Sequence, residues 1–518
     1  MDFKNPDTLL PAVLYRVRNA NGKSYKKIRP EREHSKNAVA KMKKNTIILF
    51  NPMPVEHPVA ITNKMTTSLQ VPLINVPLSL LALARMVRDD FDVKIINAVV
   101  DSDYRQNILD ACDDALCLAV SSMTCYQIRD GIEVCKAVKE HNPALPVIWG
   151  GYHPSTEPTQ TLNNPYIDIV IRGQGELTFK EVVHKLRNNI PLNGVKGVSF
   201  KDGGRIVENP AQEFKSLDLF PPIPYEMVDV ERHVKGYKFA KRCLDYYASQ
   251  GCAAGCDFCS EPLFCGRRWS GLAAQTVVSE LEYLAKTYDI DTFMIRDSDF
   301  FINVPRVKNI CNLLIDKNLG IRLTSVNGRM EQLSRIDDDV WGLFRKAGIH
   351  EIFFGFESGL QEALDAMNKG AKTGQIKICV DKCIKHDIDI RGSFMVGIPG
   401  MDAKEEMIRT FDEINGIISA YGKIGKLSHM DILLSFFTPY PHTKLYDASL
   451  KNGLKPLDTL EDWGDFDQFD FKAPWYSQEY FDLVKEFRAG MPMNSGCDFN
   501  EWCGFYEGIV KKLGELND

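Results

Sequence analysis

The chain has 518 residues, which is too long for one hydrophobic core and corresponds to two or three domains. Its 44% hydrophobic and 25% charged residues are typical of a soluble globular protein, and its net charge of -6 shows no overall nucleic-acid footprint. No apolar run is long enough for a membrane helix and no export signal stands at the start, so we predict a cytoplasmic protein without a membrane span.

Residues 1–44 are polar and rich in lysine and arginine, with little hydrophobic periodicity. We interpret them as a basic N-terminal extension that is solvated or packed on the surface. A tail that binds nucleic acid is the alternative.

Residues 45–200 alternate short apolar runs with helical patterns, which is typical of βαβ units and a parallel sheet. The expected strands are residues 46–50, 93–98, 116–121, 146–150 and 167–171. The fold class is therefore α/β, beginning with a doubly wound, flavodoxin-like or Rossmann-like domain.

Ligands of such sheets bind at the carboxyl ends of the strands, so the residues there are candidate ligand contacts. They combine glycines, which let a large ring approach the backbone, with polar side chains. No GxGxxG follows the first strand, which disfavours a dinucleotide. The candidates are Pro52, Ser121, Ser122, Met123, Thr124, Gly150, Gly151, Tyr152, His153, Gly173, Gly175 and Glu176.

Residues 201–241 contain several glycines and prolines and are predicted to be a linker. A second α/β pattern covers residues 242–440. Its strand candidates after the first are residues 292–295, 321–326, 351–355, 389–395 and 430–435, which fit a partial barrel of six βα units with its chemistry at the strands' carboxyl ends.

Cys252, Cys256 and Cys259 form a CxxxCxxC motif just after the first strand of this second pattern. Soft thiolates at this spacing can hold one iron–sulfur cluster, and three thiolates on four irons leave one iron open. A zinc site that lacks its fourth ligand and three unrelated core cysteines are the alternatives. The other cysteines are expected to be reduced thiols.

The motif, with Phe258 just before its last cysteine, resembles the radical S-adenosylmethionine (SAM) superfamily. The resemblance implies that the open iron of a [4Fe-4S] cluster chelates SAM and that SAM is cleaved to a 5′-deoxyadenosyl radical. It also implies SAM contacts near the motif and at later strand ends: Phe258, Asp297, Ser298, Asp299, Arg329, Glu357, Lys369, Gly397, Ile398 and Pro399. For each residue taken singly, a helix cap, a turn or a surface ion pair is the alternative.

The glycine-rich strand ends of residues 45–200 resemble the cobalamin-binding domain that precedes the SAM domain in one large radical SAM class. The class resemblance implies cobalamin as a third cofactor. The chain departs from methionine-synthase-like cobalamin proteins because no histidine follows an aspartate at the DxHxxG spacing. We therefore expect the nucleotide tail of cobalamin to lie along the sheet, with His153 contacting a corrin amide or capping a helix.

Residues 441–518 form a small α-rich segment with many aromatic residues, including Phe466, Phe469 and Trp475. We interpret the segment either as a lid over the open side of the partial barrel or as a small core of its own.

The resemblance implies a cobalamin-dependent radical SAM enzyme. Our hypothesis is a methyltransferase that moves a methyl group from SAM through methylcobalamin to an unactivated carbon. A cyclase or rearrangement enzyme and an RNA-modifying enzyme are the alternatives. The expected partners are a small-molecule or natural-product intermediate and an external flavodoxin- or ferredoxin-type electron donor, while the acidic balance argues against nucleic acid.

Overall fold

The structure is a computed structural model that describes residues 13–18, 24–29, 44–54, 74–465 and 470–516. The chain divides into two compact units, Met1–Lys43 and Lys44–Asp518. In the first unit, β1 (Val13–Arg18) and β2 (Ser24–Arg29) pair as antiparallel strands. This hairpin was not predicted, and the rest of the basic extension up to Lys43 lies outside the described residues.

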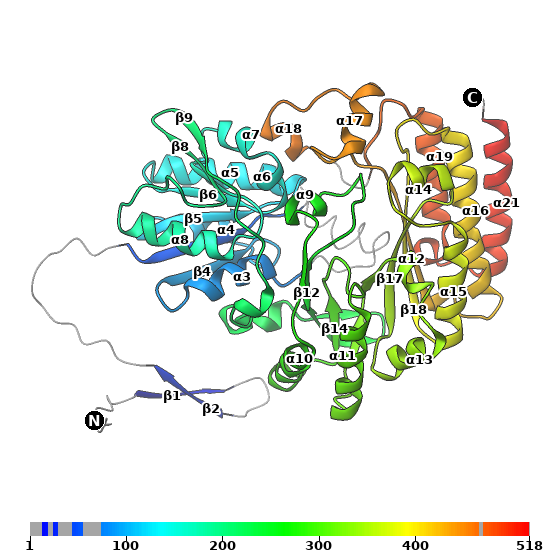
Figure 1. Ribbon diagram of the computed structural model, residues 1–518, viewed down its shortest axis with the longest axis horizontal. Helices are drawn as coiled ribbons and strands as arrows, with labels where there is room; N and C mark the ends of the chain where they lie inside the picture. Colours follow the sequence, from blue (N-terminus) through cyan, green and yellow to red (C-terminus); the bar gives the residue numbers. More distant parts are fainter. Residues whose placement is uncertain (1–12, 19–23, 30–43, 55–73, 466–469, 517–518) are drawn as a thin grey trace, which may run out of the picture. The chain divides into compact units, whose positions relative to one another are not determined.

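The second unit begins with a seven-stranded sheet in the order β4-β3-β5-β6-β7-β8-β9 (Figure 1). The first five strands of this order are parallel, as predicted, and their sequence order is the 2-1-3-4-5 order of flavodoxin-like folds. The strands are β3 (Thr46–Asn51), β4 (Asp92–Asn97), β5 (Ala115–Ser121), β6 (Val147–Gly150), β7 (Ile169–Ile171), β8 (Val198–Asp202) and β9 (Arg205–Glu208).

Helices cover both faces of this sheet, so each face has its own hydrophobic core. One core packs α4 and α5 against the sheet, and the other packs α3 and α8 against the opposite face. The helices are α3 (Leu78–Val87), α4 (Tyr104–Ala111), α5 (Tyr126–His141), α6 (Tyr152–Thr156), α7 (Pro158–Asn163) and α8 (Glu176–Arg187).

The predicted linker 201–241 is partly regular structure. β8 and β9 form an antiparallel hairpin that extends the first sheet. Both turn residues, Gly203 and Gly204, have positive φ angles of 53° and 83°, which a two-residue hairpin turn requires. The glycine pair between two short apolar runs was the sequence signal, and the interpretation as a linker missed it. Three short turns follow: η2 (Leu217–Leu219), η3 (Tyr225–Met227) and η4 (Val230–Arg232).

The second part is the predicted partial barrel, with six parallel strands in chain order. Its third strand is broken into β15 and β16 at Ser325, whose φ is +51° and whose N–H donates to Glu351. The strands are β10 (Lys235–Tyr237, an antiparallel addition), β11 (Ala240–Tyr246), β14 (Thr292–Ile295), β15 (Arg322–Thr324), β16 (Val326–Gly328), β17 (Glu351–Glu357), β18 (Asp389–Val396) and β19 (Met430–Phe436).

A small hairpin, β12 (Ser249–Gly251) with β13 (Trp269–Gly271), stands at the carboxyl end of β11. The helices of this part are α9 (Glu261–Cys265), α10 (Ala274–Tyr288), α11 (Val304–Lys317), α12 (Met330–Leu333), α13 (Asp338–Lys346), α14 (Gln361–Ala366), α15 (Gly374–His386) and α16 (Ala403–Gly422), with η5 (Leu427–His429) before β19.

The C-terminal segment is helical, as predicted, and divides between the two parts. α18 packs against the first domain, where Leu460 and Trp463 are buried in its core, whereas α19 and α21 pack on the barrel (Figure 1). Phe466 and Phe469 lie outside the described residues. The helices are α17 (Lys444–Lys451), α18 (Leu460–Gly464), α19 (Gln478–Gly490), α20 (Pro492–Ser495) and α21 (Phe499–Glu515). Within the described ranges, none of the helices combines the length and the apolar character needed to span a bilayer.

Candidate active site

The three motif cysteines lie in the loop between β12 and α9, at the carboxyl end of the first barrel strand. Gly251, directly before the motif, has φ +83°, and a Cβ there would lie 2.3 Å from the carbonyl oxygen of Arg268. Only glycine therefore lets β12 pair with β13 at this point. The hairpin fixes where the cysteine loop begins.

Asp297 holds the start of this loop through hydrogen bonds. Its carboxylate is fully buried and accepts hydrogen bonds from the Ala248 N–H at 2.6 Å and from the Ser249 hydroxyl. Arg306 holds the same segment by donating to the carbonyl of Ala248 at 2.7 Å. Asp297 was predicted to bind SAM, but both of its oxygens are already occupied. Its observed contacts position the cysteine loop.

The three thiols lie close enough to one another to interact electrostatically. Burial raises the pKa of Cys252 to about 11, and proximity to Cys256 adds to the rise. Burial likewise raises the pKa of Cys259 to about 12, with the other two thiols adding to it. With pKa values this high, the thiols lose their protons when they bind a metal. A group of thiols of this kind therefore fits an iron–sulfur cluster.

Within the part of the chain that the structure describes, no three His, Cys, Asp or Glu side chains converge closely enough to hold a single metal ion. The zinc alternative requires such convergence. An iron–sulfur cluster does not, because each thiolate binds a different iron atom. A cluster with one open iron needs only these three thiolates from the chain.

Arg329 places a cation beside the thiols. Its Nη1 donates to the Sγ of Cys256 at 3.1 Å, its Nη2 donates to the carbonyl of Lys369 at 2.5 Å, and its Nε pairs with Glu331. Hydrogen bonds to ligating sulfurs and nearby charge set the potential of a cluster. The sequence placed Arg329 among the SAM contacts, whereas the structure places it on a cysteine.

Lys369 and Glu357 form a buried ion pair with 2.7 Å between Nζ and Oε1. The Lys369 ammonium also lies 5.9 Å from the ring centre of Phe258, inside the cysteine motif. Glu357 has φ +67°, an uncommon conformation for a residue with a side chain and one that concentrates at functional sites. The structure thus brings three predicted SAM contacts together.

Asp299 joins this group. It is 1% exposed, accepts from the Phe301 N–H at 3.1 Å, and interacts electrostatically with Arg329 and Lys369. Burial raises the pKa of Asp299 to about 7. The neighbouring Ser298 is exposed, and its hydroxyl hydrogen bonds to Glu261.

The turn at Gly397, Ile398 and Pro399 was predicted to offer an open backbone edge to adenine. Its donors are occupied, because the N–H groups of Gly397 and Ile398 donate to Glu406 at 2.7 Å and 3.3 Å. The carbonyl of Gly397 accepts from the Trp475 indole at 3.0 Å. The open edge is therefore absent at Gly397, and a buried carboxyl holds the turn instead.

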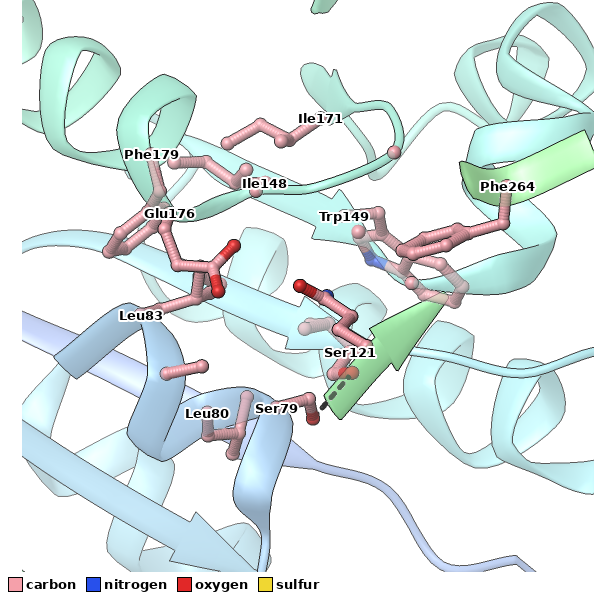
Figure 2. A pocket seen from close by; sticks show the side chains of 18 residues that line it. Ser79, Leu80, Leu83, Ser121, Ile148, Trp149, Ile171, Glu176, Phe179 and Phe264 are labelled. Atoms are coloured by element: carbon pink, nitrogen blue, oxygen red, sulfur yellow. Dashed lines mark hydrogen bonds between the residues drawn. The ribbon is translucent and has the colours of Figure 1, made fainter. Parts of the chain in front are cut away.

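A pocket of about 640 Å³, its open mouth included, lies in the first domain at the carboxyl ends of β5 and β6 (Figure 2). It is lined by Ser79, Leu80, Ala82, Leu83, Ala119, Val120, Ser121, Ile148, Trp149, Gly150, Gly151, Ile171, Gly173, Gly175, Glu176, Phe179, Gln250 and Phe264.

Six of the predicted cobalamin contacts line this pocket, and six do not. Those that line it are Ser121, Gly150, Gly151, Gly173, Gly175 and Glu176. Those outside it are Pro52, Ser122, Met123, Thr124, Tyr152 and His153. Gly151, with φ +106°, has no room for a Cβ, which would lie 2.5 Å from the carbonyl oxygen of Ser122.

His153 is fully buried beside the pocket and does not line it. Its Nδ1 hydrogen bonds with the Thr124 hydroxyl at 3.0 Å, and its ring lies 5.6 Å from that of Trp463 in α18. Burial lowers the pKa of His153 to about 3, so the imidazole is neutral. The structure contradicts the expected contact with a corrin amide and shows a core histidine.

Gln250 and Phe264 both line the pocket, and in the chain they stand just before and just after the cysteine motif. The pocket and the cysteine loop therefore share a wall. Tyr152 joins the two domains here. Its hydroxyl donates to Glu261 in α9, and its ring stacks on Phe264 at 4.6 Å between centres. The pocket and the loop therefore lie next to each other and do not open on opposite sides of the molecule.

Comparison with protein families finds two domains in this order. The B12 binding domain family matches residues 67–183, and the radical SAM superfamily matches residues 246–413. The uncharacterized methyltransferase PH0819 of Pyrococcus horikoshii is 30% identical to the chain over 386 residues, covering 73% of this chain and 79% of that protein. The chain belongs to the cobalamin-binding radical SAM enzyme family.

A second curated relative and a solved structure are also similar to the chain. The anaerobic magnesium-protoporphyrin IX monomethyl ester cyclase of a Synechocystis strain is 25% identical over 392 residues, covering 74% of each chain. A solved structure of the radical SAM methyltransferase TsrM from Kitasatospora setae, with cobalamin and a [4Fe-4S] cluster bound, matches with a TM-score of 0.65. It is 18% identical, and the match covers 91% of this chain and 99% of that one, so it demonstrates a shared fold.

The cofactors of this radical SAM enzyme are a [4Fe-4S] cluster, SAM and cobalamin. The residues present fit these cofactors. The three thiols lie together with Arg329 at the sulfur of Cys256, and the buried Lys369–Glu357 pair lies beside them. The glycine-lined pocket lies against the same loop. The sequence analysis missed Gln250, Phe264 and Glu406. It also missed Tyr440, a half-buried residue whose hydroxyl interacts electrostatically with Cys259 and with Cys125 of the first domain. The prolines that flank Tyr440 were its one sequence signal.

Replacing Cys252, Cys256 and Cys259 together by alanine is expected to abolish iron–sulfur absorption and SAM cleavage while cobalamin remains bound, because all of the pocket's lining residues except Gln250 and Phe264 lie in the first domain. Iron analysis, visible spectra and 5′-deoxyadenosine assays test this. The half-exposed Cys503 is the matched control, and C503A should keep the cluster. Cleavage retained in the triple variant would refute the assignment.

Gly150→Leu is expected to lower the affinity for cobalamin without removing the cluster. A Cβ at Gly150 meets only the Ile171 carbonyl at 3.6 Å, so the fold tolerates a side chain while the pocket loses space. Cobalt-to-iron ratios after reconstitution measure the effect, and G416L in α16 controls for added bulk. An unchanged cobalt content would argue against this pocket.

Glu406 predicts a pH dependence of stability. Burial raises the pKa of Glu406 from its ordinary 4.5 to about 8, so the stability this group contributes is complete below 4.5 and is lost as the pH rises through about 8. The melting temperature of the wild type should therefore fall more steeply than that of E406Q between about pH 5 and pH 8.5. Parallel slopes for the two proteins would contradict this assignment.

Proposed function

We propose that the protein is a cobalamin-dependent radical SAM methyltransferase that methylates an unactivated carbon of a small molecule. The family membership and the relative from Pyrococcus horikoshii, which carries a methyltransferase name, support this proposal. The observation that carries it is the shared wall: Gln250 and Phe264 line the pocket and flank the cysteine motif, so both cofactors would meet at one cavity.

When bound, the cluster supplies the electron that cleaves SAM, and cobalamin supplies the methyl group. The protein itself binds and orients the cofactors and the substrate, and it excludes water. Arg329 offsets negative charge at Cys256, and the Asp297–Arg306 support keeps the cysteine loop in place. Such preorganisation matters because small displacements of reacting groups lower rates strongly.

The SAM site is proposed to consist of the group beside the cluster. Lys369 offers a cation to the SAM carboxylate, and Asp299 offers a carboxylate to the SAM amino group. Glu357 holds Lys369 in place, and Phe258 lies against it. We assign cobalamin to the pocket of residues 45–200 and the radical chemistry to residues 242–440. We further propose a flavodoxin- or ferredoxin-type protein as electron donor in a reducing cytoplasm.

A substrate-independent experiment separates methyl transfer from the alternative of a non-methylating cyclase. The protein, reconstituted with iron, sulfide and cobalamin, is incubated anaerobically with methyl-labelled SAM and a chemical reductant. A methyltransferase should form both S-adenosylhomocysteine and 5′-deoxyadenosine, with label on cobalamin. Formation of 5′-deoxyadenosine with no S-adenosylhomocysteine and no labelled cobalamin would overturn the proposal.

Lys369→Met is expected to weaken SAM binding by about tenfold to a hundredfold, because a charged hydrogen bond is lost and Glu357 is left buried without its partner. Equilibrium dialysis with the cluster in place measures the affinity. The matched control is K377M, which removes an exposed lysine paired with Asp381 on the surface of α15. Equal affinities of K369M and K377M would remove Lys369 from the SAM site.

A further inference from the structure

The pocket in the first domain has one ionisable side chain among its described lining residues, Glu176. Glu176 is the first residue of α8 and is 3% exposed. Figure 2 shows its carboxyl group reaching into the pocket, among apolar side chains such as Leu83, Ile148 and Phe179. An ionisable group in this position requires an explanation, because apolar walls alone would hold an apolar ring.

Glu176 is held by a buried arginine. The Nη2 of Arg85 donates to its Oε1 at 2.9 Å, and both side chains are at most 4% exposed. Arg85 is fixed in turn, because its Nη1 donates to the Pro221 carbonyl at 3.1 Å and its guanidinium lies 4.8 Å from the ring centre of Phe220. Burying such a pair is costly unless its remaining hydrogen-bonding capacity is used.

The other polar side chains of the pocket have partners of their own. The hydroxyls of Ser79 and Ser121 lie 3.2 Å apart and hydrogen bond to each other. Gln250 accepts from the side chain of Gln174 at 2.9 Å. Burial raises the pKa of Glu176 above its ordinary value, so the carboxyl takes up a proton more readily than a solvated one and can share it with a ligand.

Cobalamin contains a group that is complementary to the residues lining this pocket. Its nucleotide ends in a benzimidazole, a flat apolar ring pair with one ring nitrogen that carries a free lone pair whenever the base is not on cobalt. A buried nitrogen of this kind needs a hydrogen-bond partner. The apolar walls fit the rings, and Glu176 fits the nitrogen.

We propose that Glu176, positioned by Arg85, hydrogen bonds to the ring nitrogen of the cobalamin nucleotide base, so that the pocket selects cobamides whose lower base carries such a nitrogen. This inference rests on the assignment of cobalamin to the pocket. Cobamides with a phenolic lower base have the same corrin ring and nucleotide loop but no ring nitrogen. They leave Glu176 buried without a ligand partner.

The experiment compares three ligands on the full chain with its cluster reconstituted. Equilibrium dialysis measures the affinities for cobalamin, for the cobamide with a para-cresol base, and for cobinamide, which lacks the nucleotide. Cobalamin is expected to bind about tenfold to a hundredfold more tightly than the cresol cobamide, the usual effect of losing one hydrogen bond to a buried charged group. Cobinamide is expected to bind weakest.

Two variants test the residue. E176Q keeps a hydrogen-bond donor and should keep the preference for cobalamin. In E176L combined with R85M, apolar side chains replace the buried pair without leaving an unpaired charge, which often preserves stability. There the cresol cobamide should bind as tightly as cobalamin. Iron content and the melting temperature check that each variant is folded.

The outcomes are distinguishable. Equal affinity for cobalamin and the cresol cobamide in the wild type, with both above cobinamide, would overturn the role of Glu176 and leave the pocket assignment intact. Equal affinity for all three ligands would overturn the pocket assignment as well. A preference for cobalamin that survives in the E176L/R85M variant would also refute the proposal.

Discussion

The contact between Tyr152 and α9 is the constraint on which the rest of the site depends. The Tyr152 hydroxyl donates to Glu261, and its ring stacks on Phe264. Because Glu261 lies two residues after Cys259 and Tyr152 stands in a glycine-rich strand end of the first domain, this contact sets the cluster loop against the pocket. Two cofactors can react through one substrate only if their sites share a cavity.

A second anchor joins the two domains on another side. Asp245 is fully buried in β11 and accepts from the Val76 N–H at 3.0 Å, from Lys235 at 3.0 Å and from Arg296 at 2.7 Å. Lys235 also donates to Asn75. Nearby cations lower the pKa of Asp245 although burial opposes them, so the carboxylate stays ionised. A paired, hydrogen-bonded network of this kind specifies one docking geometry.

Trp463 and Trp475 of the C-terminal segment pack against different parts of the chain. Trp463 is buried in the core of the first domain, beside His153, and Trp475 donates to the carbonyl of Gly397 in the barrel. The chain thus leaves the barrel, returns to the first domain and comes back to the barrel. This path ties the ends of the two sheets together, which limits their separation.

The sequence by itself determined the two α/β parts and the cysteine motif, because hydrophobic periodicity and ligand spacing are local properties, whereas the strand order came from the structure. The sequence could not tell which of several similar polar residues at the strand ends lies beside the cluster. Asp297 supports the cysteine loop, whereas Asp299, two residues on, joins the charged group beside the cluster. Only the tertiary structure decided this, and it likewise buried His153 and turned Glu176 into the pocket, because burial and partners depend on residues far apart in the chain.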